Sequence, residues 1–287
     1  MAEPSRPPRL DRRRLEDRWR RVALGIGVAM VAIWALLHWL YDLGYPNDPV
    51  GVAFGVAATL LMSAVAAYGL RRRAMSLATR LGLGSAPRWL ALHLYGGWLF
   101  LVAMFLHSGL QWPDGAFSWC LWLLSVWTVL TGALGLMLQR TVPRLLAAGA
   151  SVEVHYDRIP ALVEDLRRRA EALVAAADRP VQVLYRRRLA PVLAAPRRNP
   201  AVFLDADGGR RRLEPVARLR SLLEPDERER LAELEELVRA KLDLDTHFTL
   251  QQVLRGWLWL HLPASILLVV LVIVHIASVA YYGGFAP

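Results

Sequence analysis

The sequence contains a single cysteine, Cys120, among 287 residues. One thiol cannot form an intramolecular disulfide, a CxxC redox pair, a cysteine-ligated iron–sulfur cluster or a CxxCH attachment site for c-type haem. Lysine is equally scarce, since Lys241 is the one lysine of the chain. Any tightly held redox group must therefore bind through other side chains.

Charge is absent from five long stretches of the chain. The chain is 55% hydrophobic and its mean hydropathy is +0.30, which is too apolar for one soluble domain of this length. A helix of about 20 apolar residues spans the hydrocarbon core of a bilayer. The sequence therefore predicts an all-α membrane protein with five transmembrane helices. The uncharged runs cover residues 22–41, 50–70, 89–110, 117–138 and 257–282.

The basic residues lie in three segments only. Residues 1–21 carry eight of the 35 Lys and Arg, residues 71–88 carry five, and residues 139–256 carry the other 22. Basic residues accumulate on the cytoplasmic side of membrane proteins. We therefore expect a bacterial inner-membrane protein whose N-terminus and residues 139–256 are cytoplasmic and whose C-terminus is periplasmic. The net charge of +10 then reflects topology, so no nucleic-acid partner is expected.

This topology predicts four parts of the chain. Residues 1–21 form a basic cytoplasmic segment, and residues 22–140 contain the first four spans. Residues 141–250 are too long for an ordinary connection and are expected to form a cytoplasmic domain. Residues 251–287 contain the fifth span and a short periplasmic tail. In this arrangement the third and fifth spans run in the same direction.

The cytoplasmic insertion has the pattern of a small α+β domain. Amphipathic periodicity predicts helices at residues 160–177 and 226–242. Short apolar runs predict strands at 181–185, 201–204 and 213–216, with a turn at 205–209. The insertion shows no phosphate loop, metal-ligand spacing or nucleophile–base arrangement, so we expect it to dock partner proteins.

Four histidines in two spans share one spacing. His93 and His107 are 14 residues apart in the third span, and His261 and His275 are 14 apart in the fifth. Fourteen helical steps return to within about 40° of the starting direction and rise by roughly 21 Å. Because the two spans are parallel, His93 lies level with His261 and His107 lies level with His275. Two facing imidazoles can ligate haem iron from both sides. The spacing therefore predicts two b-type haems, one near each side of the membrane.

On these two His-x13-His helices, the chain resembles the di-haem membrane cytochromes b, which include the cytochrome b of bc-type complexes and the transmembrane core of ferric reductases. In the ferric-reductase group the corresponding histidines also lie on the third and fifth spans. The chain ends just after the fifth span, so no flavin or NAD(P)H domain is expected. The glycine-rich stretch at 82–85 has no preceding strand and does not read as a dinucleotide fingerprint. The resemblance implies electron transport and two bis-histidine haems.

Other polar residues near the spans have candidate roles. Arg88 and Arg255 stand five and six residues before His93 and His261, where they could pair with propionates of the inner haem. His247 continues the histidine face into the cytoplasm and could contact a propionate. Glycines would allow helices to approach a porphyrin closely. These glycines are Gly25, Gly27, Gly96, Gly97, Gly132 and Gly135.

The sequence predicts an electron-transfer subunit that carries electrons between a cytoplasmic-side partner and a periplasmic-side partner or quinone. The expected partners are membrane lipid and other redox subunits, of the iron–sulfur, flavin or multihaem cytochrome kinds. One alternative is an enzyme that itself oxidises quinol or reduces quinone, with His38 or Asp114 as its acid–base group. A second alternative is a haem-free anchor or transporter whose histidines only pack the helices. The five spans contain no Asp, Glu, Lys or Arg, which coupled transporters usually employ.

Overall fold

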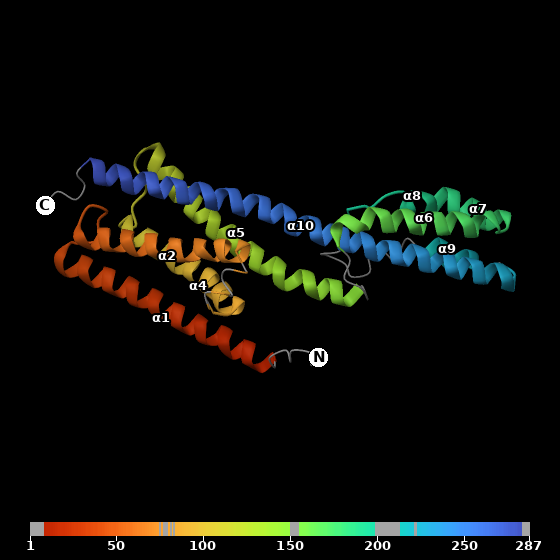
Figure 1. Ribbon diagram of the computed structural model, residues 1–287, viewed down its shortest axis with the longest axis horizontal. Helices are drawn as coiled ribbons and strands as arrows, with labels where there is room; N and C mark the ends of the chain where they lie inside the picture. The colour runs from red at the N-terminus through yellow and green to blue at the C-terminus, as the bar shows by residue number, and fades with distance from the viewer. Residues whose placement is uncertain are drawn as a thin grey trace. The chain divides into compact units, whose positions relative to one another are not determined.

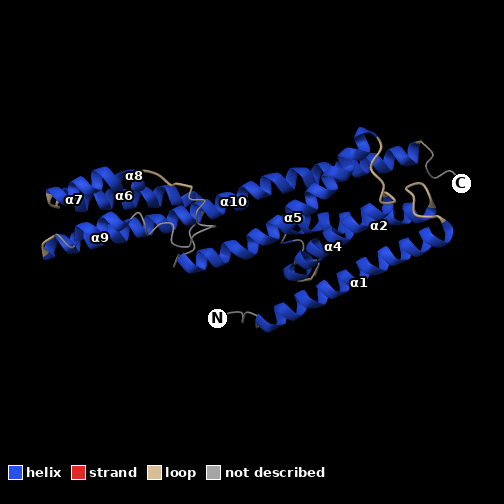
Figure 2. Ribbon diagram, turned by 180° about the vertical axis from the view of Figure 1, so that it is seen from behind, coloured by secondary structure: helices blue, strands red, loops and turns tan. Residues whose placement is uncertain are grey.

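The computed structural model describes residues 9–149 except 75, 77–79, 81 and 83, together with 155–198, 213–220 and 223–282. Every regular element in these ranges is a helix, and they contain no strand (Figure 2). The chain divides into two compact units. We call residues 1–134 with 259–287 the span unit, and residues 135–258 the insertion unit.

Five long helices contain the predicted spans (Figure 1). All five are long and apolar enough to cross a membrane, so the expectation of five such helices is confirmed. Their bounds are α1 Arg9–Tyr41, α2 Pro49–Arg73, α4 Ala86–His107, α5 Gly115–Gly149 and α10 Pro225–Tyr281. The third span begins and ends three residues earlier than the predicted 89–110, because α4 runs from Ala86 to His107. Gly109 and Leu110 then adopt left-handed φ values of 63° and 57°, which terminate the helix.

The span unit exposes large apolar side chains along its helices. Leu24 of α1 is 67% exposed, Leu60 of α2 is 66% exposed and Ile273 of α10 is 61% exposed. Such a surface is unfavourable in water, whereas contact with lipid chains accommodates it. The helical backbone satisfies its own polar groups, as a lipid environment requires.

The interior of the span unit is small and lies along α4. This helix packs against both α1 and α2. A buried cluster joins Ala58 and Met62 of α2, Phe100 and Ala103 of α4, and Leu268 of α10. Phe100 lies midway between His93 and His107 on α4, and Leu268 lies midway between His261 and His275 on α10. These two side chains therefore form an apolar layer between the two levels of histidines.

Every regular element that is described in the insertion unit is a helix, which makes the predicted strands at 181–185 and 213–216 wrong. Residues 181–185 lie in α7, Arg179–Leu184, and in the π-helical turn η2, Tyr185–Leu189. Val181, Tyr185 and Leu189 are all buried, and their four-residue spacing is that of one helix face. The short apolar run looked like a strand because its helical period becomes evident only over a longer window.

The other elements of the insertion unit are also helices. They are η1 Tyr156–Arg158, α6 Ile159–Ala175, α8 Ala190–Leu193 and α9 Glu214–Arg220. The predicted helix at 160–177 is confirmed as α6, whose buried residues are Ile159, Val163, Ala170 and Val174. The predicted helix at 226–242 is confirmed as the first part of α10, where Leu231, Leu234 and Val238 are buried. The strand expected at 201–204 and the turn at 205–209 lie outside the described residues.

Candidate functional site

Two pairs of histidines face each other between α4 and α10. The ring centres of His93 and His261 are 6.3 Å apart, and those of His107 and His275 are also 6.3 Å apart. The planes of the paired rings are inclined by 78° and 72°. Because the pairs match in chain order, the two helices run parallel here, as the sequence predicted.

The separation of the paired rings fits ligation of one metal by two imidazoles. A nitrogen–metal bond is about 2.0 Å long and the ring centre lies about 1.1 Å behind the nitrogen, so two imidazoles on opposite sides of one iron have centres roughly 6.2 Å apart. Both pairs have this separation. Among the described residues, no group of three or more His, Cys, Asp or Glu could hold a bare metal ion. Paired ligands suit haem, because the porphyrin supplies the other four nitrogens.

Helix α2 orients both histidines of α4. Nδ1 of His93 lies 3.1 Å from the carbonyl oxygen of Val65, and Nδ1 of His107 lies 2.8 Å from that of Gly51. A carbonyl oxygen can only accept, so Nδ1 carries the proton in both rings and Nε2 keeps its lone pair. The two carbonyls are 14 residues apart on α2, which is the spacing of the two histidines. Such outer hydrogen bonds fix the tautomer and orientation of metal-binding histidines.

A threonine of α5 has the same role for His261. Nδ1 of His261 lies 2.9 Å from Oγ1 of Thr131. The hydroxyl of Thr131 donates its proton to a backbone carbonyl, that of Trp127 at 2.8 Å. Oγ1 must therefore accept from Nδ1 of His261, which again leaves Nε2 as the available nitrogen.

Glycine allows the rings to lie against the helix backbones. A Cβ atom at Gly55 of α2 would lie 2.8 Å from Nδ1 of His107, so a side chain there would collide with the ring. A Cβ atom at Gly132 of α5 would lie 3.6 Å from the His261 ring, which is ordinary contact. Of the other glycines singled out from the sequence, Gly96 meets Val65, whereas Gly25 and Gly97 face open space.

Asp48 holds the first turn of α2, which carries the acceptor for His107. Its Oδ1 accepts hydrogen bonds of 2.8 Å from the amides of Val50 and Gly51, and its Oδ2 accepts from the amides of Gly44 and Tyr45. Burial by itself raises the pKa of Asp48, but the four amide hydrogen bonds together outweigh it and hold the pKa below its usual value. The amide of Gly51 is thus fixed by Asp48, while its carbonyl binds His107.

We expect replacement of Asp48 with alanine to destabilise the turn between α1 and α2 by about 0.5–2 kcal/mol, as for the loss of other helix caps. The lowered pKa means that the carboxylate stabilises the fold above the ordinary Asp pKa of about 3.9, and that this stability is lost as the pH falls through the lower folded value. Thermal unfolding in detergent should show this acid dependence in the parent protein and a weaker one in Asp48→Ala. Asp114→Ala, in an exposed loop, is the control, and equal behaviour of both variants would contradict the role of Asp48.

The three candidate propionate contacts lie in different parts of the structure. Arg88 lies in the first turn of α4. The guanidinium of Arg255 lies 3.9 Å from the ring centre of Tyr156 and 3.5 Å from the carboxylate of Asp157. His247 is buried within the insertion unit. The role of each as a propionate contact stays a prediction.

His38 and Asp114, the acid–base candidates of the alternative enzyme, lie apart in the chain: His38 is in the last turn of α1, and Asp114 is in the connection between α4 and α5. The ring of His38 stacks on Trp34 with centres 5.0 Å apart, and its Nδ1 bonds to the carbonyl of Leu43 at 3.0 Å. Asp114 is exposed between α4 and α5. The ring of His38 is therefore held by its own helix and by the segment that follows it.

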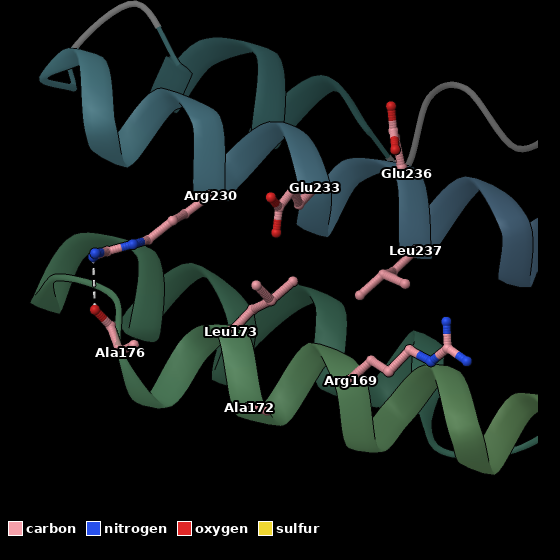
Figure 3. A pocket seen from close by; sticks show the side chains of 8 residues that line it. All are labelled: Arg169, Ala172, Leu173, Ala176, Arg230, Glu233, Glu236 and Leu237. Atoms are coloured by element: carbon pink, nitrogen blue, oxygen red, sulfur yellow. Dashed lines mark hydrogen bonds between the residues drawn. The ribbon is translucent and has the colours of Figure 1, made fainter.

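A groove of about 560 Å³ lies between α6 and the first part of α10 (Figure 3). Its two arginines are already engaged: Arg230 donates to the carbonyl of Ala176 at 2.7 Å and pairs with Glu227, and Arg169 pairs with Asp165. Figure 3 shows the remainder of the lining as carboxylates and aliphatic side chains. This arrangement offers no nucleophile with a neighbouring base, so the groove is a weaker candidate than the histidine pairs.

Sequence reasoning missed the residues that orient the histidines. These residues are Gly51, Gly55, Val65 and Thr131. Val65 and Gly51 act through backbone carbonyls, which any residue type supplies, so their identity carries no signal. Gly51 and Gly55 stand one helical turn apart in α2, and this glycine spacing is the signal that the sequence offered. A scan against protein-family models, a search of curated proteins and a search of solved structures each found no match to this chain.

Proposed function

We propose that this protein is a di-haem b-type cytochrome that carries single electrons across a bacterial inner membrane. His93 and His261 would hold the haem nearer the cytoplasm, and His107 and His275 the haem nearer the periplasm. The observation that carries the proposal is the equal 6.3 Å separation of the two histidine pairs, which suits axial ligation on both sides of an iron.

Haem supplies a one-electron redox centre. The residues of this chain bind and orient it: the Nδ1 hydrogen bonds of His93, His107 and His261 direct Nε2 away from the outer partners and raise its basicity. With two histidines as its ligands, the haem would offer no open coordination site to small ligands, so electron transfer is the expected activity. Arg88, at the start of α4, is suited to pair with a propionate of the inner haem.

The proposed sidedness and partners follow from the charge distribution. Every Lys and Arg lies in the segments assigned to the cytoplasm, and the opposite connections carry only Asp42, Asp48 and Asp114 as charged residues. Electrons would pass between a cytoplasmic-side flavin or iron–sulfur subunit and a periplasmic-side multihaem cytochrome or quinone.

Haem content tests this proposal directly. Purified protein from haem-sufficient cells should contain roughly two b haems per chain by pyridine haemochrome assay, because each pair fills the axial positions of one iron. Redox titration should resolve two one-electron centres, and the absorption spectra should be those of low-spin haem. A well-folded protein that contains no haem would contradict the proposal and favour a haem-free anchor.

A further inference from the structure

A second groove, of about 480 Å³, lies in the insertion unit beside the start of the apolar run of α10. Its lining includes Arg198, Arg255, Tyr156 and Gln252. We propose that this groove binds a phosphate-bearing anion, either the headgroup of an anionic phospholipid or free phosphate.

Tyr156 is fixed as a donor that faces the groove. Its ring stacks on Phe248 with centres 5.2 Å apart and planes inclined by 9°. Its hydroxyl oxygen accepts a hydrogen bond of 2.9 Å from the side-chain amide of Gln252. The hydroxyl proton is then directed away from Gln252, where it can donate to a ligand.

Arg255 is held over this same ring, 3.9 Å from its centre. This cation–π contact orders the guanidinium, whose five N–H donors can still bind a further partner. The partner carboxylate of Asp157 lies 3.5 Å away, but the two side chains are 54% and 86% exposed. An exposed pair of this kind contributes at most about 1 kcal/mol, so a phosphate can displace it.

The charge of the groove and its position favour a phosphate. Arg198 supplies a second guanidinium from the segment that follows α8. Gly256 and Trp257 follow Arg255, and the uncharged run begins there. Under the proposed membrane topology, this is the level of the cytoplasmic headgroups, where basic pockets bind anionic lipid. The inference rests on that topology and not on the haems.

Lipid binding can be measured on the intact protein. Native mass spectrometry in detergent should show one site that prefers phosphatidylglycerol to phosphatidylcholine, and Arg198→Gln/Arg255→Gln should weaken phosphatidylglycerol binding about tenfold, as expected for lost charge-assisted hydrogen bonds. Tyr156→Phe keeps the ring under Arg255 and removes only the hydroxyl, so it should weaken binding by a smaller factor. Arg169→Gln, an exposed arginine in the other groove of the insertion unit, is the matched control.

The result also identifies the source of the phosphate. Competition by inorganic phosphate, with no preference among lipids, would support the anion site and assign it to a soluble ligand. Equal binding of the two lipids without phosphate competition, or undiminished binding in both the double variant and Tyr156→Phe, would overturn the proposal. Haem content is measured on the same samples. Because Arg255 is also a predicted propionate contact, Tyr156→Phe, which has no assigned haem contact, is the variant in which weakened lipid binding with unchanged haem separates this proposal from the proposed function.

Discussion

Replacement of His107 with alanine is expected to remove one haem and leave the other bound. His107 faces His275, and the other pair lies 14 residues away along both helices, a rise of roughly 21 Å. The apolar layer of Phe100 and Leu268 separates the two levels. Haem content should therefore fall from roughly two to one per chain, because a single imidazole holds iron too weakly at this site. One wave should disappear from the redox titration.

The partners within a pair should behave as a unit. His107→Ala, His275→Ala and the double variant should all retain the inner haem alone, since both ligands are needed to hold the same iron. His93→Ala and His261→Ala are each expected to lose the inner haem and to retain the outer haem. His155→Ala, at an exposed position of the insertion unit, should keep both haems. Retention of two haems by both His107→Ala and His275→Ala would refute the assignment of this pair.

Replacement of Lys241 with methionine is expected to cost about 3–5 kcal/mol of stability, as for other buried pairs that lose one partner. The side chain of Lys241 is fully buried, and its ammonium donates to Oδ2 of Asp245 at 2.6 Å. Oδ1 of Asp245 accepts from the amide of Arg197 at 2.8 Å. The variant would leave a carboxylate that is 2% exposed without its cation. Urea denaturation of the full-length protein measures the loss.

A second ion pair on the same helix provides the control. Arg239 and Glu235 have the same four-residue spacing, but the arginine is 56% exposed. Arg239→Met should therefore change the free energy of unfolding by no more than about 1 kcal/mol. If both substitutions cost the same, burial would not account for the effect of Lys241.

The spans could be predicted because lipid imposes one rule on a whole run of residues. A single charge would interrupt residues 257–282, and none occurs. The insertion unit follows no such rule. Val181–Tyr185 contains β-branched and aromatic residues that also suit a strand, and only burial of Val181, Tyr185 and Leu189 on one face selects the helix.

The histidine pairs were predictable for a related reason. Their 14-residue spacing on parallel helices fixes both face and level, so the sequence alone brought His93 to His261 and His107 to His275. The hydrogen bonds that orient these rings were not predictable in the same way. The acceptors of Val65 and Gly51 are main-chain oxygens, and only the antiparallel packing of α2 against α4 brings them within reach.

Because Lys241 is buried, chemical modification of this side chain can report local unfolding of the insertion unit. An amine-directed reagent can modify this side chain only when the surrounding helices separate, because no part of it is exposed in the closed structure. Arginine, the other basic residue, does not react with such reagents. The rate of acylation at Lys241, followed by peptide mass spectrometry, would therefore measure local unfolding of the insertion unit under native conditions.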